Sequence, residues 1–164
     1  MSTIICRILK RIDHGKDLDK TLNVYTSARG LFINLDKVTE ALINSTLKLG
    51  IRCHTLVKGQ HTQKTVTFVK ACIAFAHITI PTIESYLTQV HLFQMAAQVA
   101  LLNGLIGETD SLLKGVLATI SDNFKDTPED LERVTQTVLQ MLGFLVVVPS
   151  NPEDQYFQIV EGII

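Results

Sequence analysis

The chain has 164 residues, of which 46% are hydrophobic and 19% charged, with 9 Gly, 4 Pro and no Trp. This composition excludes an intrinsically disordered chain, and the scarcity of helix breakers favours helices over strands. The formal net charge is −1, and the basic residues form no stripe with interleaved aromatic residues, so nothing specific indicates nucleic-acid binding.

Hydrophobic periodicity and turn signals then predict about eight helices joined by short loops. In chain order we expect them at about residues 3–12, 17–29, 34–57, 62–79, 81–103, 108–121, 128–148 and 152–164. Gly30 is expected to end the second helix, Asn34 to cap the third and Pro81 to begin the fifth. The clearest helix starts are Thr127-Pro128 and Asn151-Pro152, where a capping side chain precedes a proline at the first helical position. Pro149 is expected to end the seventh helix.

The middle of the chain is almost free of charge. The stretch from Ser85 to Gly107 contains no charged residue, and its length would suit a membrane span. Polar residues interrupt it, however, and each is costly in lipid: Gln89, His91, Gln94, Gln98 and Asn103. The preceding helix, at 62–79, carries apolar residues on two faces. We therefore expect helices that are sandwiched between neighbours.

Charge is also divided between the two halves of the chain. Residues 1–70 hold 12 Lys and Arg against 5 Asp and Glu, whereas residues 71–164 hold 3 against 11. The simplest interpretation is solvated surface charge. The alternative is that the two ends of the molecule bind partners of different charge.

No residue pattern indicates catalysis, a cofactor or a metal site. The chain lacks a phosphate-binding loop, a nucleophile elbow and an HExxH motif. Cys6, Cys53 and Cys72 are far apart and are expected to be free thiols in a reducing compartment. His77 and His91 are expected to be core or interface residues. A multi-helix chain without reactive groups favours an interaction surface, built either as a globular bundle or as stacked antiparallel hairpins.

Several segments, in this order and spacing, resemble the large scaffold subunit of retriever, which is related to the retromer scaffold. They are Asp13–Asp17, Lys58–Thr65 followed by Phe68–Cys72, Ile78–Pro81, Gln98–Leu101, and Val148-Pro149 with Pro152 three residues later. The resemblance runs from about Ile4 to the last residue and is weakest over 121–131. No single motif is diagnostic, but the order over some 150 residues is specific.

The resemblance implies an all-α fold in which antiparallel helical hairpins stack as an α-solenoid of the HEAT/TPR-like type. Residues 1–164 would be a single segment of a longer chain, namely its C-terminal portion. The implied function is that of a non-catalytic scaffold in an endosomal cargo-recycling complex. Its partners would be a subunit with a metallophosphoesterase fold and the rest of the scaffold chain. The location would be cytoplasmic and endosome-associated, with membrane contact only through the complex.

Two loops are the candidate partner-binding sites, by motif match and expected exposure. One loop carries Lys58, His61 and Lys64, and the other carries His14, Lys16 and Asp17. The competing interpretation is that these residues only turn the chain and cap helices. Tyr86 and Phe93 are further candidates, for which core packing is the simpler interpretation. Alternatives for the whole chain are the retromer scaffold itself, another helical-repeat adaptor, or a small helical enzyme or ligand-binding bundle.

Overall fold

The computed structural model describes residues 2–32, 34–123, 125 and 127–146. Within this part, the chain forms seven α-helices and one short 3-10 helix, and no strand is found there. The elements are α1 (Ser2–Arg11), α2 (Leu18–Leu31), α3 (Asp36–Val57), α4 (Gln63–Thr79), η1 (Ile80–Thr82), α5 (Tyr86–Leu102), α6 (Ile106–Asn123) and α7 (Pro128–Val146).

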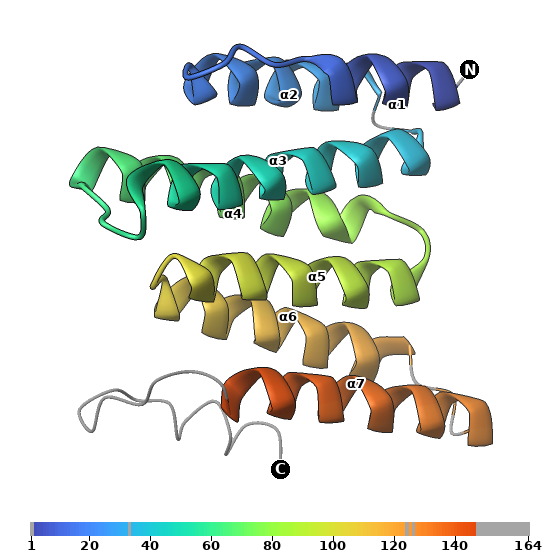
Figure 1. The fold of residues 1–164 in the computed structure, drawn as a ribbon. Coiled ribbons are helices and arrows are strands. Elements are labelled where there is room, and N and C mark those ends of the chain that lie inside the picture. Colours follow the sequence, from blue (N-terminus) through green and yellow to red (C-terminus); the bar gives the residue numbers. More distant parts are fainter. Residues whose placement is uncertain (1, 33, 124, 126, 147–164) are drawn as a thin grey trace.

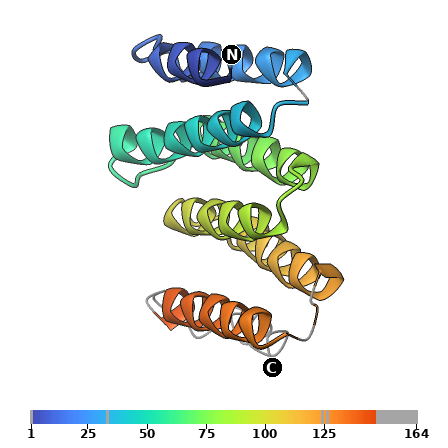
Figure 2. The same ribbon diagram turned by 90° about the vertical axis from the view of Figure 1, so that its right-hand side faces the viewer.

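The helices form antiparallel hairpins that stack along one axis, as Figures 1 and 2 show. The hairpins are α1–α2, α3–α4 and α5–α6, and α7 lies beyond the third. Helices α1, α3 and α5 pack side by side in one layer, while α2, α4 and α6 form the other. The predicted all-α stack of helical hairpins is confirmed, and the closed globular bundle is not what the described residues form.

Helix α4 is buried on two faces because it lies between α3 and α5. Val69, Ile73 and Ala76 on one face, and Phe68 and Cys72 on the other, are all buried. The expectation of sandwiched helices is therefore confirmed. By length and composition alone, one described segment, Gln63–Thr82, would suffice to cross a membrane. The burial of α4 on two faces also explains why this segment is apolar, since a helix packed between neighbours carries apolar residues on more than one side.

Three expected helix boundaries are wrong. Gly30 does not end α2, because the helix continues to Leu31 and closes when the Phe32 N–H donates to the Ala28 carbonyl oxygen. Asn34 does not cap α3, because the N-cap position falls on Leu35, whose side chain cannot accept a hydrogen bond.

Pro81 does not begin the fifth helix. It lies in η1, a single turn that extends α4 before the chain turns. Proline lacks an N–H and cannot continue the α-helical hydrogen bonds, so the chain leaves the helix here. Helix α5 starts only at Tyr86, after Ser85, whose hydroxyl oxygen accepts the Thr88 N–H at 3.4 Å. The helix then continues without interruption through Gln94 to Leu102.

Two histidines and two aromatic residues of the uncharged stretch lie in different environments. His91 is exposed, which excludes the core and leaves the interface of its two expected places, whereas His77 is half-buried with its ring edge-on to Phe93. Phe93 is buried, and Tyr86 is half-buried. Core packing is therefore confirmed for Phe93.

Helix α7 starts at Pro128, as predicted, and reaches Val146 within the described residues. It joins the stack through Met141, which is buried, and through the Gln94 side-chain amide, which donates to the Thr137 carbonyl oxygen at 3.4 Å. The predicted stop at Pro149 and the eighth helix at 152–164 lie outside the described residues.

Gly30→Ala is expected to stabilise the protein by about 0.5 kcal/mol, because alanine restricts the unfolded chain more than glycine does. Gly30 is helical, its φ is not positive, and a Cβ added there would meet no atom within 4 Å. A urea titration followed by circular dichroism measures the change. A loss of stability would mean that α2 ends before Gly30, as the sequence predicted.

Candidate partner-binding edge

The loops that close the three hairpins lie at one edge of the stack, on the left in Figure 1. We call this surface the hairpin edge; it comprises residues 10–20, 54–64 and 103–105. The first two of these segments contain all six candidate residues. Consecutive hairpins therefore bring together two loops that are more than 40 residues apart in the sequence.

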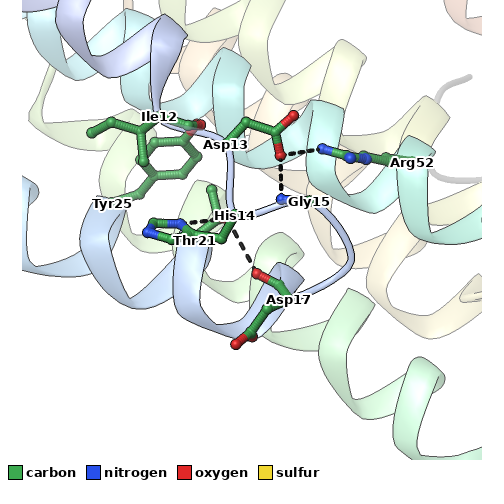
Figure 3. A network of polar contacts seen from close by, with 8 residues as sticks. All are labelled: Ile12, Asp13, His14, Gly15, Asp17, Thr21, Tyr25 and Arg52. Carbon is green, nitrogen blue, oxygen red and sulfur yellow. Dashed lines mark hydrogen bonds and ion pairs between the residues drawn. The ribbon is translucent and has the colours of Figure 1, made fainter.

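The first loop is fixed by Asp13. Its Oδ1 accepts the Gly15 N–H at 2.8 Å and the Arg52 guanidinium of α3 at 2.8 Å (Figure 3). These bonds hold the pKa of Asp13 below its usual value, with the Arg52 hydrogen bond as the largest cause and the Gly15 N–H next. Gly15 adopts a φ of 64°, which glycine adopts at no steric cost. The loop is thus tied to the neighbouring hairpin.

The three candidate residues of this loop differ in their roles. The His14 ring is half-buried, with Nδ1 and Thr21 Oγ1 hydrogen-bonded at 3.1 Å (Figure 3). Asp17 is the N-cap of α2, and its Oδ1 accepts the Lys20 N–H at 3.0 Å. Lys16 is exposed, and no ion pair engages it within the described part of the chain. Only Lys16 is therefore fully available to a partner.

The second loop turns on two consecutive left-handed residues. Lys58 has a φ of 53° and Gly59 a φ of 76°, and the Gly59 N–H donates to the His54 carbonyl oxygen at 3.1 Å. Thr62 then starts α4 with a capping box, in which the side chains and backbone N–H groups of Thr62 and Thr65 bond reciprocally. The sequence predicted this helix start correctly.

His61 packs against His54 across the second loop. His61 Nε2 and His54 Nδ1 are 3.4 Å apart, and the ring centroids are 5.6 Å apart. His61 Nδ1 is buried and has no hydrogen-bond partner among the described residues. This pair links the end of α3 to the loop, so His61 helps to hold the loop in shape. Lys58 and Lys64, by contrast, are exposed.

Sequence reasoning missed three further cations at the same edge. Lys10 and Arg11 end α1, and Lys20 lies in the first turn of α2; all three are exposed. Their only sequence signal was the basic excess of residues 1–70. That the end of α1 and the start of α2 lie toward the same side of the stack as the turn between α3 and α4 follows from the antiparallel order of α1 to α4, which hydrophobic periodicity alone does not give.

Groups with catalytic potential are few in the described residues. No group of three or more His, Cys, Asp or Glu side chains there could hold a metal ion. Cys53 and Cys72 are free and buried, and burial raises the pKa of both thiols, so neither is activated as a nucleophile. A shallow, mostly apolar groove lies between α5, α6 and α7, lined by Tyr86, Leu87, Val90, Ile120, Arg133, Val134 and Thr137.

Asp13→Ala is expected to speed solvent exchange of the Gly15 amide proton, because the substitution removes its acceptor and the link to Arg52. The melting temperature should change little, since an exposed ion pair contributes little to stability. Amide exchange followed by NMR measures the first effect and a thermal melt the second. Unchanged exchange at Gly15 would show that other contacts fix the loop.

Comparison with known proteins places the whole chain in a family. The family model described as "VPS35L C-terminal domain" matches residues 1–164. The chain is 32% identical over 168 residues to "VPS35 endosomal protein sorting factor-like" of Dictyostelium discoideum, covering 99% of this chain and 17% of that protein. It is 29% identical over 160 residues to "VPS35 endosomal protein-sorting factor-like" of Homo sapiens, covering 93% of this chain and 16% of that protein.

A relative of the same name in Danio rerio is 28% identical over 170 residues, which cover all of this chain and 18% of that protein. The chain thus spans about one sixth of the length of the curated relatives that it matches. The activity and partners of the longer proteins are not properties that this similarity alone assigns to the chain.

Proposed function

The chain belongs to the VPS35L C-terminal domain family, whose relatives are endosomal protein-sorting factors, and from this premise we propose that it is a non-catalytic scaffold segment of the retriever cargo-recycling complex. The observation that carries the proposal is the hairpin edge, where two fixed loops at the same edge of a stacked helical scaffold carry exposed lysines. Such stacks provide extended surfaces for other proteins. The proposed location is the cytoplasmic side of endosomes.

The proposed partner at this edge is the subunit with a metallophosphoesterase fold. Lys16, Lys58 and Lys64 would make the contacts, because they are exposed and engaged in no ion pair within the described residues. His14, His61 and Asp17 would act indirectly, since their hydrogen bonds hold the two loops in shape. This division of roles follows from burial and bonding at each position.

A second contact is proposed for the outer face of α1. Ile4 and Ile8 lie one helical turn apart there and are 64% and 58% exposed, whereas Leu9 of the same helix is buried. Helix α3 is covered on both sides within its layer, by α1 and α5. We propose that another part of the longer scaffold chain covers these two isoleucines in the same way.

Co-purification tests the proposed partner. The chain is mixed with the metallophosphoesterase-fold subunit of retriever and passed over a size-exclusion column, and we expect a complex of one copy each. A triple variant, Lys16→Ala/Lys58→Ala/Lys64→Ala, is expected to reduce binding. Circular dichroism establishes that each sample is folded. Separate elution of the two folded proteins would refute the proposed function for this segment.

A further inference from the structure

We infer that the hairpin edge recognises an acidic segment of its protein partner, one that lies across the first two hairpin loops. This inference rests on the proposed function and adds the chemistry of what is bound. It depends on the number of exposed cations at the edge, on the few carboxylates near them, and on the spacing of the two loops.

Six exposed cations lie within residues 10–20 and 54–64: Lys10, Arg11, Lys16, Lys20, Lys58 and Lys64. None of them forms an ion pair within the described residues, whereas the three cations that do so lie elsewhere on the helices. Those three are Arg52 with Asp13, Lys70 with Glu108, and Lys114 with Asp110. Arg7, Lys37, Lys48 and Lys125 are also exposed and in none of these ion pairs, but they lie outside these two segments, which hold six such cations.

Carboxylates do not cancel this charge. Asp13 is engaged by Arg52, and Asp17 accepts a backbone N–H as the cap of α2. Asp19 is the remaining exposed carboxylate of the two loops. The ends of the helices contribute little net charge, because each loop joins the negative end of one helix dipole to the positive end of the next. The side chains thus leave an excess of positive charge at the edge.

The loops are spaced to suit an extended peptide. Neighbouring packed helices lie about 8–10 Å apart, and an extended chain advances about 3.3 Å per residue. An extended segment of about six residues spans about 20 Å, or about two such spacings, and is therefore long enough to cross both loops. Since the Asp13–Arg52 pair and the capping of α4 at Thr62 fix both loops, little conformational entropy is lost on binding.

A protein segment fits this edge better than an anionic membrane surface does. Binding at a membrane interface depends on large apolar side chains that insert among the lipids. Among the large apolar residues of segments 10–20 and 54–64, Leu56 is exposed, at 53%, whereas Ile12 and Val57 are half-buried and Leu18 is buried, so at most one side chain could insert fully. The exposed carboxylate of Asp19 would also be repelled by an anionic lipid surface, but it can pair with a single basic residue in a mixed-charge partner.

Fluorescence anisotropy tests the inference with a labelled peptide of six glutamates and a matched peptide of six glutamines. We expect the 164-residue chain to bind the acidic peptide alone and to lose affinity as the salt concentration rises. Lys58→Glu/Lys64→Glu should weaken binding by about tenfold or more. The matched control is Lys37→Glu/Lys48→Glu, an equal charge change at exposed positions of α3 away from the loops, which should change it by less than about twofold.

Three outcomes would overturn the inference: no binding of the acidic peptide, equal weakening by both double variants, or binding to phosphatidylserine-containing vesicles that Lys58→Glu/Lys64→Glu abolishes while peptide binding persists. The last outcome would assign the edge to lipid. The proposed function is tested separately. If the metallophosphoesterase-fold subunit co-purifies equally well with both double variants, the acidic-segment inference fails while the scaffold function stands.

Discussion

Replacing Ile73 with aspartate is expected to unfold the protein at room temperature. Ile73 is 2% exposed on the face of α4 that is buried in the core. An unpaired carboxylate in that position costs several kcal/mol, whether it stays charged or is forced to be neutral. Since the whole stability of a domain is about 5–15 kcal/mol, this single change removes most of it. Circular dichroism and a thermal melt measure the loss.

Ile78→Asp is the matched control, because Ile78 lies on the same helix but is 57% exposed. It should keep the helical signal and a melting temperature close to that of the parent chain. If Ile73→Asp also melted like the parent, the sandwiched position of α4 between α3 and α5 would be wrong.

Phe93→Ala is expected to cost about 3–5 kcal/mol, as large-to-small changes in a packed core do. The Phe93 side chain is 3% exposed, and its ring lies against Gly115 of α6 and edge-on to His77 of α4. Removing the ring leaves a cavity where three helices meet. A urea titration gives the change in the free energy of unfolding.

Gly115, which faces the Phe93 ring, allows the same contact to be tested from the other helix. A Cβ added at Gly115 would lie 3.1 Å from Phe93 Cε1 and 3.3 Å from two more ring atoms. Gly115→Ala alone should therefore destabilise, since overpacking costs about 1–3 kcal/mol and outweighs the helix propensity of alanine. In the Phe93→Ala background, the same change should stabilise. Additive effects in this double-mutant cycle would show that α5 and α6 do not approach closely at this point.

The helices that the sequence predicted best are those with a local signal. Thr62 starts α4 through bonds with Thr65, only three residues away. Pro128 starts α7 because the first residue of a helix needs no N–H for the helical hydrogen bonds, so proline is tolerated there. The missed boundary at Pro81 depends instead on the path of the chain between two helices. Pro81 has the residue type of a helix start, yet the helix begins after Ser85, because the chain must first turn from α4 toward α5.

The candidate edge was predictable only in part. The loops around Gly15 and Gly59 follow from turn residues, and both have the positive φ that these glycines suggest. The contact between His54 and His61 does not follow from the sequence, because it depends on how Lys58 and Gly59 reverse the chain. The Asp13–Arg52 pair joins residues 39 apart in sequence and needs the stacking of one hairpin on the next.

Hydrogen–deuterium exchange on the complex with the metallophosphoesterase-fold subunit tests the central claim most directly. If the hairpin edge is the binding surface, residues 10–20 and 54–64 should gain protection on binding. The opposite edge, at residues 34–36 and 82–85, should exchange as it does in the free chain. Protection confined to that opposite edge or to the groove between α5, α6 and α7, with the two loops unchanged, would contradict the account.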